Sequence, residues 1–156
     1  MTQITKILCP VDFSACSEHA AKRAMELAEH FNAELALMHC FEHQVYALPD
    51  MAGWTYAGEH RPLTEMARDA AQVQLGELQE ALATPPGTRW LLAEGSPATS
   101  ILEETRRGGY DLLVMGTHGR TGLQHLLLGS VAERVMRSAT CPVLIMKEPE
   151  FKAAAR

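Results

Sequence analysis

Short apolar runs alternate along this chain with longer segments in which apolar residues recur every three or four positions. An unbroken apolar run is typical of a buried strand, and a three-to-four-residue period is typical of a helix with one buried face. The runs predict strands at residues 4–11, 34–41, 88–93, 110–115 and 142–146. The periodic segments predict helices at residues 16–31, 63–82, 97–107 and 129–138, the second of them weakened locally by Gly76.

This alternation of strands and helices predicts an α/β fold. We expect one domain over residues 1–148, a Rossmann-like, open and mostly parallel five-stranded sheet with helices on both faces. Residues 42–62 lack a steady period and predict an irregular excursion, either a lid or a flexible loop. At the start of the third helix, Ser96 is the expected N-cap and Pro97 the first helical residue. Residues 149–156 are expected to form a loose C-terminal tail.

A glycine-rich stretch follows the fourth predicted strand and leads into the fourth predicted helix. In open parallel sheets, ligands bind beyond the carboxyl ends of the strands, where the strand order reverses. A glycine loop at this place puts the reversal between the first and fourth strands, and so predicts the strand order 3-2-1-4-5. Asp12, at the end of the first strand, is then expected to face the loop across the crevice.

The glycine-rich stretch, residues 116–130, has the chemistry of an anion site. Glycines let a ligand approach the backbone closely, and the free N–H groups and dipole at a helix start attract phosphate. Ser130 offers a hydroxyl that either caps the helix or donates to a phosphate oxygen. The stretch has neither the Gly-Lys pair of a P-loop nor the G-x-G-x-x-G spacing of dinucleotide sites, and it reads G-x2-G-x9-G-S instead.

The charge of the chain limits its partners. Its net charge is −5, which argues against a general binder of nucleic acid or of anionic membrane. Residues 106–137 nevertheless carry five arginines against two acids, so the surroundings of the glycine stretch are basic and suit a small anion. No apolar run approaches the roughly 18–20 residues of a membrane span, so we expect no membrane insertion.

The cysteines and histidines give no sign of a disulfide framework or a metal centre. The four cysteines form no C-x-x-C pair and follow no signal-like segment, so we expect reduced thiols in a cytoplasmic protein. The histidines lack metal-site spacing to cysteines or acids, and His39 is expected to be a hydrogen-bonded core residue. If a metal binds, we expect Mg²⁺ held mainly by phosphate oxygens.

The order of these motifs resembles the universal stress protein family over nearly the whole chain. The resemblance is carried by residues 7–14, 36–40, 95–97, 131–135 and 141–145, and by the glycine pattern of Gly116, Gly119, Gly129 and Ser130. The complete pattern is similar to that of the family's ATP-binding branch. One departure is Phe13, since several relatives have a small residue after the aspartate.

The resemblance implies that the chain binds ATP and acts as a regulatory or sensor protein of the stress response. It implies that Asp12 and the backbone near Cys40 flank the adenine. The residues that it places along the nucleoside are Pro10, Val11, Met115 and Gly116. Those that it places around the phosphates are His118, Gly119, Gly129, Ser130, Val131 and Ala132. It also implies a homodimer through the last strand, Val143 to Met146.

Other interpretations stay open at this point. Asp12 or Ser14 alternatively caps the first helix, and Ser130 alternatively caps the fourth. No general base stands beside the expected phosphates, where Glu133, one turn into a helix, is the nearest acid. We therefore expect no catalytic residue and weak ATP turnover at most. The two alternative functions are a slow ATP-hydrolysing enzyme and a dimeric interaction module whose nucleotide site is vacant.

Overall fold

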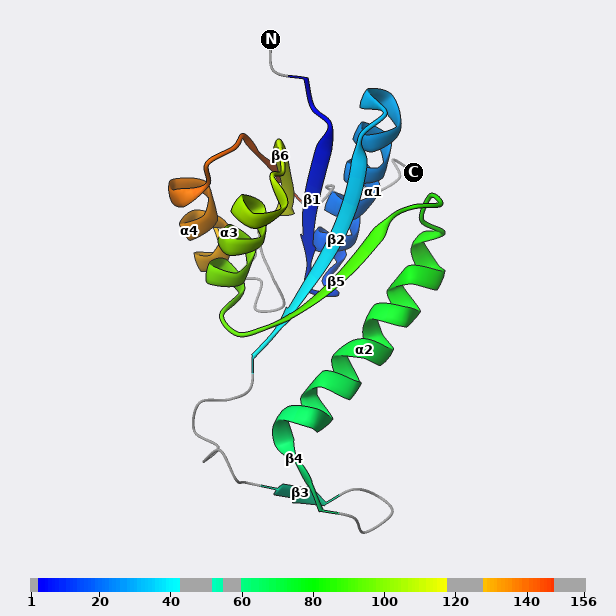
Figure 1. The fold of residues 1–156 in the computed structure, drawn as a ribbon, viewed down its shortest axis with the longest axis vertical. Helices are drawn as coiled ribbons and strands as arrows, with labels where there is room; N and C mark the ends of the chain where they lie inside the picture. The colour runs from blue at the N-terminus through cyan, green and yellow to red at the C-terminus, as the bar shows by residue number, and fades with distance from the viewer. Residues whose placement is uncertain (1–2, 43–51, 55–59, 118–127, 148–156) are drawn as a thin grey trace, which may run out of the picture.

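Five parallel strands form the central sheet, and helices pack on both of its faces (Figure 1). The computed structural model describes residues 3–42, 52–54, 60–117 and 128–147. The strands are β1 (Lys6–Val11), β2 (Glu34–Phe41), β3 (Ala52–Trp54), β4 (His60–Pro62), β5 (Arg89–Glu94), β6 (Leu112–Gly116) and β7 (Val143–Met146). The helices are α1 (Ala15–Phe31), α2 (Leu63–Leu82), α3 (Pro97–Gly108) and α4 (Ser130–Ser138). Every predicted strand and helix is present, with its ends within two residues of the prediction.

β1 lies at the centre of the sheet, and the order β5-β2-β1-β6-β7 confirms the predicted order 3-2-1-4-5. All four neighbouring pairs are parallel. Ile7 of β1 lies beside Leu35 of β2 on one side and beside Leu112 of β6 on the other. The strand order therefore reverses between β1 and β6, which is where open parallel sheets bind ligands.

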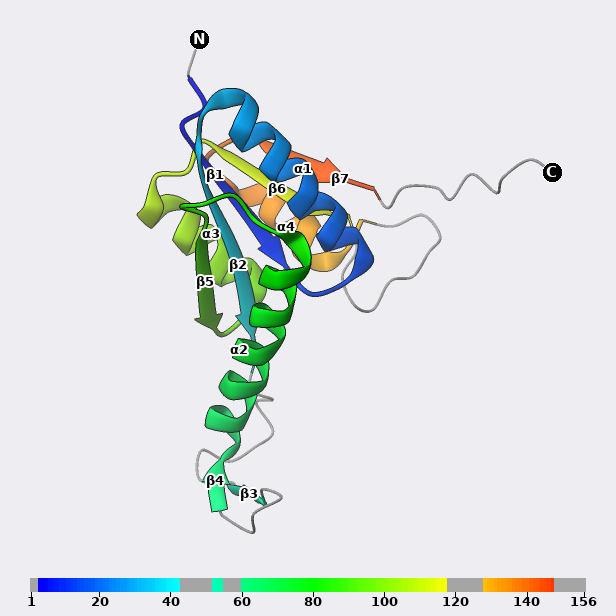
Figure 2. The ribbon, with the colours of Figure 1, turned by 90° about the vertical axis from the view of Figure 1, so that its right-hand side faces the viewer.

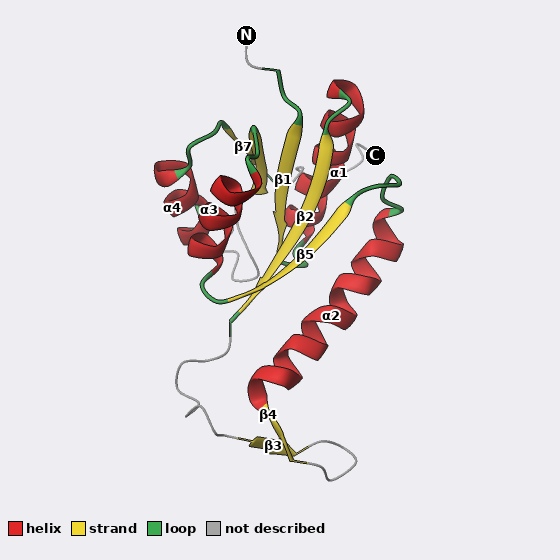
Figure 3. Cartoon of the chain, viewed as in Figure 1, coloured by secondary structure: helices red, strands yellow, loops and turns green. Residues whose placement is uncertain are grey.

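Two apolar clusters, one on each face of the sheet, hold the helices in place. Figure 3 shows the helices on both sides of the strands. α1 and α2 cover one face and lie in front of the sheet in Figure 2. The buried face of α1 is made largely of small side chains, Ala20, Ala21, Ala24 and Ala28, which let the helix approach the strands closely. α3 and α4 cover the other face, where Ile101 and Val135 pack against Leu8 and Leu113. In the described part of the chain, none of the helices combines the length and apolar character needed to cross a membrane.

Part of the segment 42–62, predicted to be irregular, forms a small antiparallel hairpin of β3 and β4. Trp54 pairs with His60, and Ala52 pairs with Pro62. Strands of three residues are too short for an alternation of apolar and polar positions to show in the sequence. The hairpin lies at the N-terminal end of α2, beyond the carboxyl ends of β2 and β5 (Figure 1). Residues 43–51 and 55–59 lie outside the described part of the chain.

Asp111 joins the start of β1 to the start of β6. Its Oδ2 accepts hydrogen bonds from the Thr5 hydroxyl at 2.7 Å, from the Thr5 backbone N–H at 2.8 Å and from the Lys6 backbone N–H at 2.9 Å. These donors, the Thr5 hydroxyl foremost, favour the ionised carboxylate and lower the pKa of Asp111 below its ordinary value of 3.8. The carboxylate thus fixes the two central strands side by side at their amino ends.

We expect Asp111→Asn to lower the free energy of unfolding at pH 7 by up to about 1 kcal/mol, because an amide accepts these hydrogen bonds more weakly than a carboxylate. Since folding lowers the pKa of Asp111, its contribution is complete above pH 3.8 and is lost as the pH falls through the folded pKa. Urea unfolding of both proteins at pH 7 and below pH 3.8 should therefore show a difference that shrinks in acid. An equal difference at the two pH values would contradict this role of the carboxylate.

Candidate functional site

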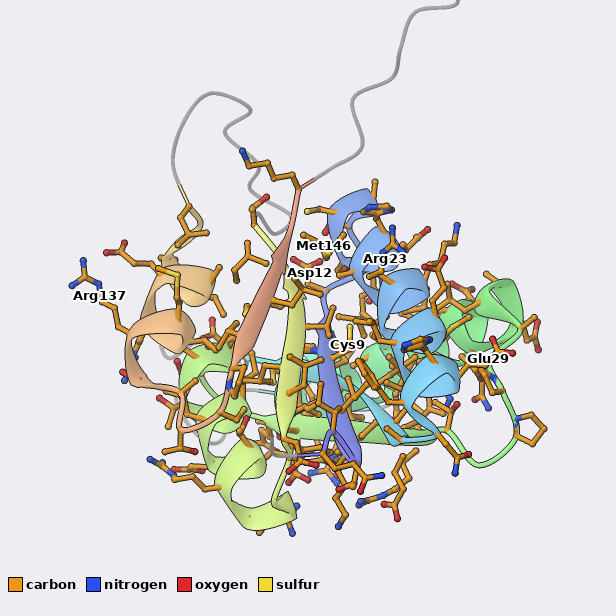
Figure 4. The ribbon with its side chains drawn as sticks, turned by 90° about the horizontal axis from the view of Figure 1, so that it is seen from above. Cys9, Asp12, Arg23, Glu29, Arg137 and Met146 are labelled. Carbon is orange, nitrogen blue, oxygen red and sulfur yellow. The ribbon has the colours of Figure 1, made fainter. Side chains whose placement is uncertain are left out.

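A pocket of about 170 Å³ opens at the carboxyl ends of β1, β2 and β6, beside the first turns of α3 and α4. Figure 4 shows Asp12 and Met146 at this same end of the sheet, one just after β1 and the other at the end of β7. The pocket therefore lies where the strand order reverses. Its lining consists of Pro10, Val11, Asp12, Ser17, Met38, Cys40, Pro97, Ile101, Met115, Gly116, Thr117, Gly129, Ser130, Val131 and Ala132.

Ten of the twelve residues predicted for a nucleotide site line this one pocket. They are Pro10, Val11, Asp12, Cys40, Met115, Gly116, Gly129, Ser130, Val131 and Ala132. The other two, His118 and Gly119, lie outside the described part of the chain and stay predictions. The fold thus brings together residues that are far apart in the sequence, from the ends of β1, β2 and β6 and from the start of α4.

Sequence reasoning missed five lining residues, namely Ser17, Met38, Pro97, Ile101 and Thr117. Met38 is the neighbour of Pro10 in the β1–β2 pair, and Thr117 directly follows Gly116. Pro97 and Ile101 lie about one turn apart at the start of α3. The Ser-Pro pair that marks this helix start could have identified Pro97 and Ile101, because a pocket at the ends of strands is also lined by the first turns of the helices that follow them.

The turn from β1 into α1 is held by a closed set of hydrogen bonds. Ser14 is the N-cap of α1, and its hydroxyl accepts from the Ser17 backbone N–H at 3.2 Å. Oδ1 of Asp12 accepts from the Ser14 hydroxyl at 2.5 Å and from the Ser14 backbone N–H at 3.1 Å. The Ser17 hydroxyl donates to the Ser14 carbonyl oxygen at 3.0 Å and accepts from the Asp12 backbone N–H at 3.2 Å. The cap is therefore Ser14 and not Asp12, which supports the cap and lines the pocket.

Phe13, the bulky residue after Asp12, adopts a left-handed backbone conformation with φ of 65°. This conformation costs a residue with a Cβ about 1–2 kcal/mol. The Phe13 ring packs against the His39 ring, with centroids 4.2 Å apart, and such pairs contribute about 0.5–1.5 kcal/mol. His39 is buried with its Nδ1 2.8 Å from the Val11 carbonyl oxygen, which confirms the predicted core histidine. Phe13 thus packs with the cluster on the α1 face of the sheet, away from the pocket lining.

α4 begins at the pocket without a side chain to cap it. Its N-cap is Gly129 and its first residue is Ser130, so the alternative in which Ser130 caps the helix is wrong. The Gly129 backbone N–H donates to the Thr117 carbonyl oxygen at 2.8 Å, which ties the two ends of the glycine-rich stretch together. The first N–H groups of a helix have no intrahelical partner, so those of α4 can serve a ligand in the pocket.

α3 also begins beside the pocket. Ser96 occupies the N-cap position and Pro97 is the first helical residue, as predicted, but the Ser96 side chain makes no capping hydrogen bond. Two helix N-termini without side-chain caps therefore meet at the pocket. Because a helix N-terminus carries partial positive charge, this arrangement favours an anionic ligand.

The ionisable side chains of the pocket are few. Among the described residues that line it, Asp12 is the one carboxylate and Cys40 the one thiol. Burial above all, and the charge of Glu42, raise the pKa of Cys40 to about 12, so the thiol stays protonated at neutral pH. The part of the chain that the structure describes holds no group of three or more His, Cys, Asp or Glu placed to bind a metal ion. The thiol in the described lining is therefore held in its unreactive, protonated form.

The lining combines apolar and polar groups. Met38 of β2, Ile101 of α3 and Met115 of β6 contribute apolar side chains. Thr117 and Ser130, after β6 and at the start of α4, contribute hydroxyl groups. A ligand that has both an apolar part and an anionic part suits such a lining.

Comparison with known proteins gives one family match, in which the model of the universal stress protein family matches residues 3–147. Universal stress protein MJ0531 of Methanocaldococcus jannaschii is 38% identical over 147 residues, which cover 93% of this chain and 83% of that protein. Universal stress protein YxiE of Bacillus subtilis is 30% identical over 145 residues, which cover 91% of this chain and 98% of that protein.

Solved structures share the fold. Universal stress protein UspA from Lactobacillus plantarum has a TM-score of 0.75 at 23% identity, covering 94% of this chain and 99% of that one. Protein MJ0577 has a TM-score of 0.73 at 25% identity, covering 95% of this chain and 99% of that one. A universal stress protein solved in complex with cAMP has a TM-score of 0.69 at 21% identity, covering 95% of this chain and 100% of that one.

Proposed function

Because this chain belongs to the universal stress protein family, we propose that it binds ATP in the pocket and acts as a regulatory or sensor protein of the stress response. The observation that carries the proposal is the start of α4, which faces the pocket with Gly129 as N-cap and no side-chain cap. A helix start of this kind leaves N–H groups for phosphate oxygens. The family member solved with cAMP supports an adenine nucleotide as the ligand.

The roles that we propose for the lining residues follow the family's nucleotide-binding pattern. Asp12 and the backbone beside Cys40 would flank the adenine. The nucleoside would lie along Pro10, Val11, Met115 and Gly116. The phosphates would be held by Gly129, Ser130, Val131 and Ala132, with His118 and Gly119 assigned from the motif. Mg²⁺ would be held mainly by the phosphate oxygens, since the described residues offer no cluster of metal ligands.

We expect ATP to be bound with little hydrolysis. Glu133, the acid nearest to the expected phosphates, pairs through its Oε1 with Arg137 at 2.9 Å. Asp12 accepts hydrogen bonds from Ser14. General-base catalysis needs a group within hydrogen-bond reach of the attacking water, and Glu133 is not among the described residues that line the pocket, while Asp12 would stand at the adenine. The arrangement therefore favours a role that depends on whether nucleotide is bound.

The test is to denature freshly purified protein, remove it, and separate the supernatant by anion-exchange chromatography beside adenine nucleotide standards. We expect near-stoichiometric ATP, or, for protein stripped of ligand, micromolar binding of Mg-ATP by calorimetry, which is about −8 kcal/mol. An empty extract together with no binding below millimolar ATP would overturn the proposal and favour the dimeric interaction module. Bound ADP or AMP together with steady phosphate release would favour the slow enzyme.

We also propose a homodimer through the edge strand β7. Val143–Met146 carries no charged residue, and Leu144 is 36% exposed. An apolar edge strand without charges or proline pairs readily with the edge of another chain, and a two-fold dimer would cover it. The four cysteines are free thiols, which fits the cytoplasmic location that we propose for this dimer.

A further inference from the structure

The carboxyl end of β7 meets the wall of the pocket at a buried junction, formed by Cys16, Thr117 and Met146. The backbone N–H of Thr117 donates to the Met146 carbonyl oxygen at 2.9 Å, and the Cys16 thiol donates to the same oxygen at 3.4 Å. Sγ of Cys16 also lies 3.7 Å from the Thr117 hydroxyl. Cys16 and Thr117 are only 5% and 7% exposed, so these contacts are shielded from water.

Thr117 belongs to the pocket as well as to the junction. It is one of the lining residues, and its carbonyl oxygen accepts from the backbone N–H of Gly129, the N-cap of α4. Its own N–H holds the last residue of β7. A ligand that fixes or displaces Thr117 or Gly129 therefore also fixes or displaces Met146, because hydrogen bonds join Gly129 to Thr117 and Thr117 to Met146.

The packing around the junction leaves little room for independent movement. A Cβ built on Gly116 would lie 2.8 Å from Sγ of Cys16 and 3.2 Å from its carbonyl carbon. The end of β6 is thus seated directly against the first turn of α1. Groups packed this closely transmit displacements rather than absorbing them. In the described sheet β7 has a neighbour on one side only, β6, and the junction adds contacts with α1 to the pairing that holds its carboxyl end.

We propose that this junction couples the pocket to the β7 edge, so that a ligand in the pocket strengthens the pairing of β7 with a second copy of the chain. The inference rests on the proposed function, because it takes ATP as the ligand and the β7 dimer as the partner. A bound nucleotide fixes Thr117 and through it Met146, so less freedom is lost when two β7 strands pair. Since coupling is reciprocal, dimer formation strengthens nucleotide binding by the same factor.

The dimer dissociation constant, measured by analytical ultracentrifugation with and without saturating Mg-ATP, tests the coupling. In the wild-type chain we expect Mg-ATP to lower this constant by at least about fivefold, the lower end of common allosteric couplings. Leu144→Lys, which puts a charge on the exposed part of β7, should weaken the dimer in both conditions if pairing uses this edge.

Variants at Cys16 separate the junction from general stability. Cys16→Ala removes the sulfur contacts to Met146 and Thr117, and we expect the ratio of the two dimer constants to fall severalfold. Cys16→Ser keeps a donor for the Met146 carbonyl oxygen and should restore most of the ratio, which a merely structural role would not require. Cys141→Ala, which removes a thiol near the other end of β7, is the matched control and should keep the wild-type ratio. If Cys16→Ala does not fold, Thr117→Val removes the hydroxyl that lies beside Sγ of Cys16; because Thr117 also lines the pocket, its dimer constants are compared at a Mg-ATP concentration that calorimetry shows to saturate this variant.

The possible results are distinguishable. A dimer constant unchanged by Mg-ATP, in a chain that binds ATP by calorimetry, would overturn the coupling and leave nucleotide binding intact. A full wild-type ratio in Cys16→Ala would overturn the part that Cys16 plays in the coupling, because the backbone hydrogen bond from Thr117 to Met146 remains in that variant. A chain that binds ATP but stays monomeric would overturn the dimer and the coupling together. Failure to bind ATP at all would overturn the proposed function, and the coupling with it.

Discussion

We expect Ser130→Asp to weaken ATP binding at least about 100-fold while the fold stays as stable as the wild type or becomes slightly more stable. Ser130 is the first residue of α4, lines the pocket and is exposed. A carboxylate there would stand beside the phosphates, and two like charges about 4 Å apart near a protein surface repel by about 4 kcal/mol. The same carboxylate interacts favourably with the N-terminus of α4, by about 0.3–1 kcal/mol. Binding and stability are therefore expected to change in opposite directions.

Two further variants make this result specific. Ser130→Ala removes only the hydroxyl, and the loss of one hydrogen bond, about 0.5–1.5 kcal/mol, predicts a roughly 2- to 13-fold weaker affinity. Thr64→Asp puts the same charge in the first turn of α2, outside the pocket lining, and should leave ATP binding unchanged. Calorimetry and thermal melting of the four proteins provide both readouts. Wild-type affinity in Ser130→Asp would exclude the start of α4 as the phosphate site.

The fold could be predicted because both faces of the sheet are buried. Strands covered on both sides, such as β1 and β6, have nearly continuous apolar sequences, which are easily told from the periodic sequences of the helices. The position of the glycine-rich stretch after β6 then settled the strand order, since it marks where the order reverses. The hairpin of β3 and β4 escaped prediction, because three residues per strand carry no measurable period.

The limits of prediction at the site come from side-chain geometry. Ser14 and Asp12 both have the chemistry of a helix cap, and only the turn geometry shows that Ser14 caps α1 while Asp12 supports it. Gly129 and Ser130 are adjacent, and the sequence does not show which of them is the N-cap of α4. The structure shows that Gly129 is the N-cap and that Ser130 is the first helical residue. Ile101 has the apolar helical pattern of a core residue, and it is one, yet it also forms part of the pocket wall. A sequence pattern does not separate these two environments.

The same substitution, glycine to alanine, is expected to act in opposite directions at Gly116 and at Gly76. At Gly116 the added Cβ would lie 2.8 Å from Sγ of Cys16 and 3.2 and 3.3 Å from its backbone carbon and oxygen. Because backbone atoms cannot move aside as a flexible side chain can, we expect Gly116→Ala to destabilise the fold by about 1–3 kcal/mol. At Gly76, in the middle of α2, a Cβ meets nothing within 4 Å. Alanine favours a helix interior over glycine, so Gly76→Ala should stabilise by about 0.5–1 kcal/mol.

Urea unfolding of the two variants and the wild type measures both changes in the free energy of unfolding, the expected loss at Gly116 and the expected gain at Gly76. The double variant Gly116→Ala with Cys16→Ala removes the sulfur contact but keeps the backbone contacts at 3.2 and 3.3 Å. We therefore expect it to show a coupling energy between the two sites without full recovery of stability. A neutral Gly116→Ala would mean that β6 can move away from α1 at no cost. In that case Thr117 would not be held against Cys16, and the coupling would rest on the backbone hydrogen bond from Thr117 to Met146 alone.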